Sequence, residues 1–384
     1  MNIKKFLFLT VLSFFLISTT YAKHQYEEYS FSAFWNYEVK GADNYYQFQS
    51  DLIQDKDVIN EIKNKKKTRL VSYLLFEDDK IKIDEYDLPS YIKNNNGLLP
   101  SHSMGKSLVS YVAGYAICEG YIDNIDVTLD DWSVLKGTLY EGQKLIDLLN
   151  MKAGDQQIIG EKNFNSDNRI KDDKYFNVNV FQIKKVMESP ILQNTKKAYS
   201  IYNYNALATN TIMNYVIFKT GDDFQKILNK VFREDAKIKN NVFFHKTIRS
   251  REKMPEEGQF GRYSFYADRY DYLRIAKAIM DNWNNDTCVG KYLKTVYDRR
   301  INKNKKNYDG DRSGQFDVAM YTKKYGGQFH FDIIGLSKRK ILGMSGFGGQ
   351  NIVIDFEKKR IIVVNSRDRH YNWKKIVLKK LKQK

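Results

Sequence analysis

Residues 100–120 read PSHSMGKSLVSYVAGYAICEG, and this stretch decides the fold that the sequence predicts. A loop composition at its start gives way to an apolar run, rich in small residues, from residue 108 to residue 117. A run that is apolar on every side predicts a fully buried helix. Ser103 then lies at the beginning of that helix, with Lys106 one turn further along the same face.

This Ser-x-x-Lys pair suits nucleophilic catalysis. A helix N-terminus favours negative charge on the serine oxygen, and burial lowers the pKa of a lysine so that it accepts the proton. The alternative interpretation is a serine cap beside a surface lysine. The same spacing recurs without an apolar helix behind it at Ser90/Lys93, Ser133/Lys136, Ser250/Lys253 and Ser337/Lys340.

Two later segments add candidate groups. Residues 198–208 (AYSIYNYNALA) form a predicted loop into a helix, and a tyrosine there could move a proton between the serine and a leaving group. With 28 tyrosines in the chain, a packing role is the alternative. Residues 343–350 (GMSGFGGQ) predict an edge strand with little side-chain bulk, along which a substrate could lie near a backbone N–H donor. An ordinary glycine-rich turn is the alternative there.

The rest of the pattern predicts the architecture. Apolar and alternating runs predict β-hairpins at 70–76 with 81–86 and at 351–356 with 360–365. We therefore expect an α/β plus all-α fold, in which one antiparallel sheet is built from both chain ends, flanked by helices, with an inserted helical region. Helices are predicted at 107–120, 140–152, 206–219 and 270–283, and at the C-terminus through Trp373, Val377 and Leu381.

The N-terminus predicts export. Residues 1–22 combine two lysines, the apolar run FLFLTVLSFFLI and small residues before Ala22, which is typical of a cleaved signal peptide. An uncleaved membrane anchor is the alternative. We expect a mature domain of residues 23–384 that is periplasmic or secreted. Outside the cytosol Cys118 and Cys288 are able to pair, and a buried free Cys118 is the other possibility.

Composition and missing motifs exclude several classes. The five histidines form no metal-binding pair, and phosphate-binding, dinucleotide-binding and Gly-x-Ser-x-Gly patterns are absent from the sequence. The formal net charge is +17, but no nucleic-acid-binding signature accompanies it. We expect no nucleic-acid partner and at most peripheral association with an anionic envelope. The sequence does not indicate an oligomeric state.

Taken in order, the three candidate segments resemble the serine β-lactamase and penicillin-binding-protein superfamily. The likeness is greatest to its class C-related branch, which contains 6-aminohexanoate-dimer hydrolases and esterases. The resemblance runs from about residue 70 to the end of the chain. Besides the Ser103 segment it is carried by residues 119–123 (EGYID), 145–154 (LIDLLNMKAG), 270–276 (YDYLRIA) and 346–350 (GFGGQ).

The resemblance implies a β-lactamase/transpeptidase-like fold and an acyl-serine mechanism on a small amide or ester, without a metal or organic cofactor. Ser103 would attack the carbonyl, Lys106 would assist its deprotonation, and Tyr199 would relay the proton. The backbone N–H groups of Ser103 and Phe347 would stabilise the oxyanion. Substrate contacts would come from Met344, Ser345, Gly346, Phe347 and Tyr202.

Two positions depart from the family pattern. Met344 stands where a Lys, His or Trp usually begins the third motif, which argues against an efficient β-lactamase or D,D-peptidase. Ile201 stands where Asn or Ser would follow Tyr199, and a shifted register offers Tyr202 as the relay instead. The alternatives are a D,D-peptidase or β-lactamase-like penicillin-binding enzyme, or a non-catalytic homologue that binds cell-wall ligands. Residues 158–174 and 249–266 are the expected loops over the site.

Overall fold

The computed structural model describes residues 35–64, 68–94, 96–155, 183–189, 192–193, 201–245, 263–305 and 317–383. Residues Asn36–Lys384 form one compact unit. The predicted signal peptide, the boundary at residue 23, Tyr199, and the predicted loops at 158–174 and 249–262 lie outside the described residues. Among the helices that are described, none is long and apolar enough to cross a membrane.

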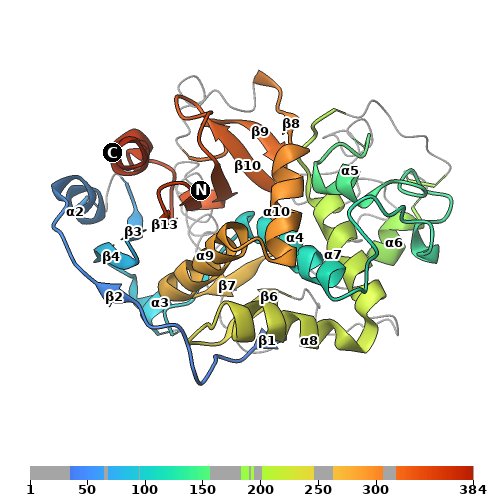
Figure 1. The fold of residues 1–384 in the computed structure, drawn as a ribbon, viewed down its shortest axis with the longest axis horizontal. Coiled ribbons are helices and arrows are strands. Elements are labelled where there is room, and N and C mark those ends of the chain that lie inside the picture. Colours follow the sequence, from blue (N-terminus) through green and yellow to red (C-terminus); the bar gives the residue numbers. More distant parts are fainter. Residues whose placement is uncertain are drawn as a thin grey trace, which may run out of the picture. The chain divides into compact units, whose positions relative to one another are not determined.

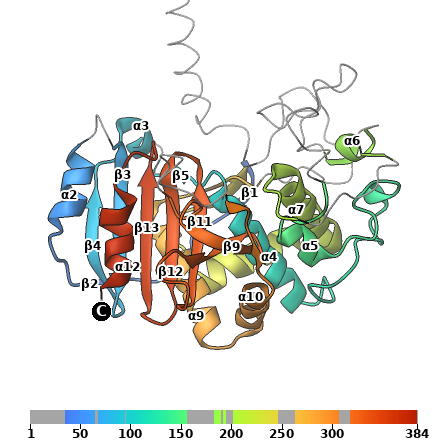
Figure 2. The same ribbon diagram turned by 90° about the horizontal axis from the view of Figure 1, so that it is seen from above.

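A nine-stranded sheet forms the centre of this unit, in the order β2-β4-β3-β13-β12-β11-β10-β9-β8 (Figures 1 and 2). Antiparallel pairing of β13 with β3 places Val363 opposite Leu74, so strands from both chain ends meet side by side, as predicted. The strands are β2 (Gln49–Ser50), β3 (Leu70–Glu77), β4 (Lys80–Tyr86), β8 (Ile301–Asn302), β9 (Thr322–Gly326), β10 (Phe329–Ile333), β11 (Ile341–Gly346), β12 (Gln350–Asp355) and β13 (Arg360–Ser366).

Both predicted hairpins are confirmed. In the first, β3 and β4 are joined through Asp78 and Asp79, whose φ angles of 52° and 58° are those of a type I′ turn, the turn that fits the twist of paired strands. In the second, the Asp355 side chain accepts hydrogen bonds from the N–H groups of Glu357 and Lys358, both at 3.2 Å, which closes the connection between β12 and β13.

Helices cover both faces of the sheet. On one face α4 (Met104–Cys118), α9 (Arg269–Asn284) and α10 (Cys288–Asp298) pack over an apolar core that includes Leu74, Leu342 and Met344. On the other face α2 (Lys56–Lys63), η7 (Lys374–Leu378) and α12 (Lys379–Lys382) pack over a second core that includes Ile362 and Trp373 (Figure 2). The predicted C-terminal helix and the helices at 107–120 and 270–283 are therefore confirmed, with α4 beginning at Met104.

The inserted helical region gathers beside α4, at the right of Figure 1. It contains α5 (Leu145–Leu149), α6 (Ile183–Met187), α7 (Ala206–Thr220), α8 (Phe224–Leu228) and the helical segment η4 (Asn229–Asp235). A second sheet, in the order β1-β6-β7-β5, joins β1 (Trp35–Val39), β6 (Val242–His245), β7 (Phe265–Ala267) and β5 (Leu99–Pro100). Short turns complete the described elements: α3 (Ser90–Lys93), η1 (Ser133–Leu135), η3 (Gly221–Asp223) and η6 (Phe347–Gly349).

The helix expected at 140–152 is much shorter, because α5 spans only Leu145–Leu149. Gly142 has a φ of 69°, in the left-handed region, and Lys144 forms an antiparallel bridge with Thr128. These backbone conformations are incompatible with a helix, although Tyr140 is fully buried. Buried apolar residues in a loop therefore have a spacing similar to that of a helix, which is why the sequence predicted a longer helix.

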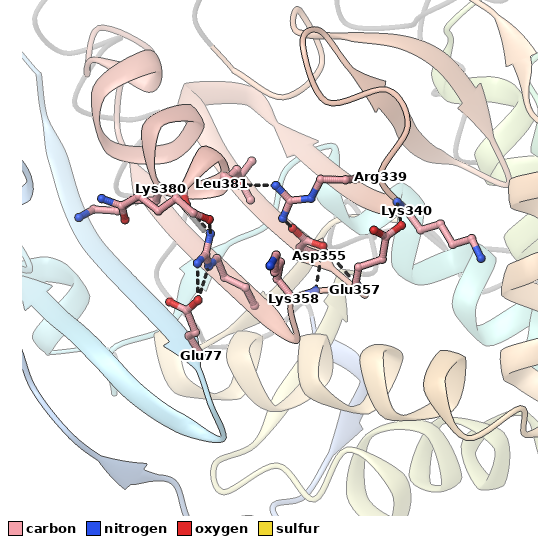
Figure 3. Close-up of polar contacts among 10 residues, drawn as sticks. Glu77, Arg339, Lys340, Asp355, Glu357, Lys358, Lys380 and Leu381 are labelled. Atoms are coloured by element: carbon pink, nitrogen blue, oxygen red, sulfur yellow. Dashed lines mark hydrogen bonds and ion pairs between the residues drawn. The ribbon is translucent and has the colours of Figure 1, made fainter.

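Two arginines fasten the C-terminal helix to the sheet (Figure 3). Arg360, only 2% exposed, donates from Nε to Glu77 at 2.9 Å and also to the carbonyl oxygen of Lys380. Arg339 pairs with the buried Asp355 and donates to the carbonyl oxygen of Leu381. Because these arginines donate to the last carbonyl oxygens of the helix, they cap its C-terminus while their ion pairs hold the arginines to the sheet.

Cys118 and Cys288 are joined in a disulfide, with their Cα atoms 5.8 Å apart. The bond links the end of α4 to the start of α10 across 170 residues of sequence. The pairing that the sequence left open is therefore made.

Candidate active site

Ser103 immediately precedes α4 as its N-cap residue, with φ −67° and ψ −11°. Its side chain makes no capping hydrogen bond, so the hydroxyl remains available to groups outside the helix. The preceding residue, His102, has a φ of 47°, an unfavourable value for a side-chain-bearing residue that recurs at functional sites. The turn is held by Ser101, which is bonded to Phe265 of β7 through backbone N–H to oxygen (2.7 Å) and through its own Oγ (2.8 Å).

Lys106 lies one turn along α4 and is only 2% exposed. Its backbone N–H donates to the carbonyl oxygen of Ser103 at 3.1 Å, which fixes the two residues on the same face of the first turn. Its Nζ lies 3.5 Å from the ring centroid of Tyr263 and 5.2 Å from that of Tyr204. The lysine is therefore buried between aromatic faces, and the alternative of a surface lysine is wrong.

Tyr204 reaches Ser103 from the loop before α7. As a whole residue Tyr204 is 41% exposed, yet its hydroxyl is buried and interacts with the Ser103 side chain. Burial of the hydroxyl raises the pKa of Tyr204, while the Ser103 hydrogen bond opposes this shift. This interaction places a proton carrier beside the candidate nucleophile.

The end of β11 closes against the same turn. A Cβ added to Gly346 would lie 2.2 Å from the carbonyl oxygen of Ser101, so the strand approaches the start of α4 as closely as glycine allows. The next residue, Phe347, is 69% exposed, and its ring centroid lies 5.8 Å from that of His102.

The prediction that β11 is an edge strand is wrong, because it lies between β12 and β10. Pairing with β10 is recorded at His330 opposite Gly343, and β11 continues from there to Gly346. The end that meets α4 thus extends past this pairing.

Solved structures with the same arrangement of sheet and helices identify the fold. A Bacillus anthracis protein assigned as a 6-aminohexanoate-dimer hydrolase superposes with a TM-score of 0.62 over 89% of this chain and 87% of its own, at 15% identity. FmtA from Staphylococcus aureus gives 0.52 over 88% and 93%, also at 15%. This chain has the fold of the β-lactamases and penicillin-binding proteins. A D-stereospecific amidohydrolase from a Streptomyces species shares that fold, with a TM-score of 0.56 over 84% and 98% at 12% identity. No family model matches the chain, and no curated protein matches it by sequence.

Within this β-lactamase fold, the sequence-predicted residues Ser103, Lys106, Gly346 and Phe347 come together around the start of α4. Met344 is fully buried in the core between the sheet and α4, so a neutral side chain fills the first position of the third motif. Ser345 is 7% exposed and follows it on β11.

Among the described residues, Tyr204 is the tyrosine beside Ser103, and the sequence did not single it out. Tyr202 is 6% exposed and packs with Met151, Ala208 and Tyr325, which does not fit the substrate contact expected of it. Tyr199 lies outside the described residues. The usable signal was Asn205, whose side chain caps α7 by accepting from the N–H of Ala208 at 2.8 Å. A cap at Asn205 places the residue before it at the helix entrance.

A buried carboxylate fixes the chain on both sides of Tyr204. Asp155 is 1% exposed and accepts from Tyr140 Oη at 2.7 Å, from Asn205 Nδ2 at 3.3 Å and from Asn203 Nδ2 at 3.4 Å. Burial raises the pKa of Asp155, and these hydrogen bonds oppose the rise. Because Asn203 and Asn205 flank Tyr204, the network holds its backbone in place.

An ion pair acts on Tyr204 through its charges. Arg369 Nε lies 3.2 Å from the buried Asp317 Oδ2, and the guanidinium carbon lies 5.7 Å from the Phe347 ring centroid. Both charges act on the pKa of Tyr204 in opposite directions, with Arg369 lowering it and Asp317 raising it. Across the part of the chain that the structure describes, no three His, Cys, Asp or Glu side chains cluster as metal ligands would.

Proposed function

We propose that this protein is an exported serine hydrolase that cleaves a small amide or ester bond through an acyl-Ser103 intermediate. The observation that carries the proposal is the placement of Ser103 at the start of α4, with the Tyr204 hydroxyl beside it and Lys106 buried one turn away. A nucleophile with two proton carriers beside it is the arrangement that serine acyl transfer needs. The shared fold supports it, since the named relatives include hydrolases.

In the proposed acylation, Ser103 is the nucleophile. Ser103 Oγ attacks the carbonyl carbon while its proton passes to Tyr204 Oη, and the phenol's own proton passes to the Lys106 amine. The tetrahedral oxyanion is stabilised by the backbone N–H groups of Ser103, at the start of α4, and of Phe347, after β11. When the intermediate collapses, the leaving amine or alcohol takes a proton back along the same route. The acyl group remains on Ser103.

Deacylation reverses these roles. Water replaces the leaving group and gives its proton through Tyr204 to Lys106, and the resulting hydroxide attacks the acyl carbonyl. Collapse of the second tetrahedral intermediate releases the carboxylic acid and returns the proton to Ser103. No group beyond these side chains is required for the proton balance.

The substrate is proposed to be uncharged where it lies along β11. A lysine or histidine at the third motif would attract a substrate carboxylate, but Met344 is neutral and buried in the core. The exposed ring of Phe347 instead offers an apolar surface beside the nucleophile. This favours a short amide or an ester over a penicillin-like acid.

Export is part of the proposal. The Cys118–Cys288 disulfide supports it, because thiols of mesophilic proteins rarely oxidise in the cytosol. The N-terminal sequence supports cleavage after Ala22. Sequencing of the protein recovered from the exported fraction should begin at Lys23, and recovery of intact Met1 from that fraction would contradict cleavage.

The test is active-site labelling. Wild type is expected to take up a fluorophosphonate probe on Ser103 and to hydrolyse p-nitrophenyl esters or short amides, and Ser103→Ala should lose both. Ser133→Ala is the matched control, because Ser133 belongs to another Ser-x-x-Lys sequence and is exposed on η1. If wild type acquires no label and turns over no ester, the hydrolase proposal is wrong. A long-lived β-lactam adduct on Ser103 would favour a penicillin-binding enzyme instead.

A further inference from the structure

The two aromatic rings beside Lys106 offset part of the free-energy cost of burying its charge. Removal from water disfavours an ammonium ion, whereas the face of an aromatic ring attracts one. The Tyr263 centroid, 3.5 Å from Nζ, is well inside the range of this attraction, and the Tyr204 centroid, 5.2 Å away, lies near its limit. Tyr263 is therefore the stronger of the two aromatic contacts of this buried amine.

The chain holds Tyr263 at this position from its backbone. A Cβ added to Gly105 would lie 1.7 Å from the carbonyl oxygen of Tyr263, so the backbone at Tyr263 rests directly on the first turn of α4. Two residues later Phe265 enters β7 and is bonded to Ser101, the residue that holds the serine turn. These backbone contacts place Tyr263 beside the first turn of α4, where its ring lies over Lys106.

We propose that Tyr263 is a positioning residue of the reaction, whose ring face stabilises the ammonium that forms when Lys106 takes up the Ser103 proton. This inference rests on the proposed function, in which Lys106 begins neutral and ends protonated. Charge then develops at Nζ between two rings that are already in place, so little reorganisation is needed during the step. The ring face thus offsets part of the desolvation that burial imposes on the ammonium.

The described groups beside this proton route are phenols and one ion pair. Tyr204 stays a neutral phenol, since burial raises its pKa, and it can pass a proton on without holding a charge. The Arg369–Asp317 pair contributes charges of both signs. Several titratable or charged groups lie around Lys106 and Tyr204 among the described residues. They include Ser103, Tyr202, Tyr204, Tyr263, Asp317, Tyr325 and Arg369.

The test compares Tyr263→Leu, which removes the ring, with Tyr263→Phe, which keeps the ring and removes only the hydroxyl. The rate of fluorophosphonate labelling of Ser103 is measured against pH for each. Because Lys106 must be neutral to accept the proton, its pKa sets the acidic limb. Loss of the ring should lower that pKa. The acidic limb of the pH–rate profile should then move to lower pH by about one to one and a half units, and the maximal labelling rate should fall. Tyr263→Phe should keep the wild-type limb.

Each outcome decides something. If Tyr263→Leu has a lower maximal labelling rate but an unchanged acidic limb of the pH–rate profile, the role of Tyr263 is merely structural and the inference is overturned. The inference is also overturned if the acidic limb shifts equally in both variants. If wild type is never labelled, the proposed function fails and this inference with it. If Tyr263→Leu does not fold, lysine side-chain NMR of wild type, assigned with Lys106→Met, replaces it. The Lys106 pKa should be the same in wild type and in Tyr263→Phe, because both proteins keep the ring. A difference of a full pH unit between the two proteins would contradict the ring-face role.

Discussion

Tyr204 lies just before α7, and its hydroxyl interacts with the side chain of Ser103, the residue that precedes α4. Tyr202, two residues earlier, is buried against Tyr325 with ring centroids 5.2 Å apart. The two neighbouring tyrosines therefore have different surroundings, and only one of them contacts the nucleophile among the described residues.

Tyr204→Phe is expected to lower kcat by about 10²–10⁴-fold, the usual contribution of a proton-transfer group. KM should change little, because the lost interaction acts in the transition state. Tyr202→Phe removes a hydroxyl from a packed position and should keep most of the activity. Steady-state hydrolysis of a p-nitrophenyl ester by both variants is the measurement. The assignment is wrong if Tyr202→Phe loses activity and Tyr204→Phe retains it.

Gly346→Ala should damage the site more than the fold. The new methyl group would meet the backbone oxygen of Ser101 at 2.2 Å, and a backbone atom cannot rotate away as a side chain can. Displacement of the strand end by about 1 Å is expected to cost on the order of 10²-fold in kcat/KM. Gly343→Ala, on the same strand, would meet the Val318 side chain instead and serves as the control. It should lower the melting temperature while retaining more activity, and equal activity losses would contradict this explanation.

Asp155→Asn should slow the reaction indirectly, by disturbing the position of Tyr204. The amide cannot accept all the hydrogen bonds that the carboxylate receives from Tyr140, Asn203 and Asn205, so the backbone around Tyr204 loosens. A drop of about tenfold or more in labelling rate is expected well below the melting temperature. The decisive readout is the double variant with Tyr204→Phe. Because Asp155 acts through Tyr204, adding Asp155→Asn to Tyr204→Phe should have little further effect, and additive losses would refute the coupling.

The sequence could predict what depends on periodicity and local composition. The apolar run after Ser103, the two hairpins and the pairing of both chain ends follow from patterns that survive folding, because a strand or a buried helix repeats its apolar residues regularly. Lys106 could be placed beside Ser103 for the same reason, since three residues make nearly one helical turn. The glycine at position 346 was recognisable because only a side chain without bulk permits such an approach.

Contacts between distant segments could not be predicted. Tyr204 and Tyr263 reach Lys106 from separate loops, and no spacing relates them to α4. The family pattern predicts Tyr199, which lies outside the described residues, whereas the Asn205 cap of α7 places Tyr204 at the helix entrance. The helix at 140–152 was overestimated because Tyr140 is buried for another reason, its hydrogen bond to Asp155. Packing and buried polar networks decide such positions, and neither has a sequence period.

The Cys118–Cys288 disulfide should matter for stability and little for catalysis. Closing a loop of 170 residues is expected to contribute about 2–5 kcal/mol to the free energy of unfolding. Cys118 ends a 15-residue helix, so it lies about 20 Å from Ser103. Reduction, or the double variant Cys118→Ser/Cys288→Ser, should lower the melting temperature but retain ester hydrolysis at low temperature. Thiol titration of the denatured, unreduced protein should find no free thiol, since the chain has two cysteines. A reduced protein with an unchanged melting temperature would contradict the stabilising role.

Lys303 predicts a pH dependence of stability. It is 5% exposed, with Nζ donating to Thr322 Oγ1 at 3.0 Å, and burial lowers its pKa to about 7, against the opposing charge of Asp317. In the unfolded chain a lysine titrates near pH 10.4, so between about pH 7 and 10 the unfolded state binds more protons than the folded state. Burial of the lysine therefore costs stability below pH 7, and this cost falls as the pH rises.

The measurement is the free energy of unfolding by urea from pH 6 to 9.5 for wild type and Lys303→Met. Relative to the variant, wild type should gain stability above pH 7 with a slope of at most about 1.4 kcal/mol per pH unit. Lys82→Met is the control, because Asp51 raises the pKa of Lys82 and its difference curve should be flat over this range. A flat curve for Lys303→Met as well would mean that Lys303 stays charged in the folded protein. In that case its hydrogen bonds, and the nearby carboxylate of Asp317, would outweigh the desolvation that burial imposes.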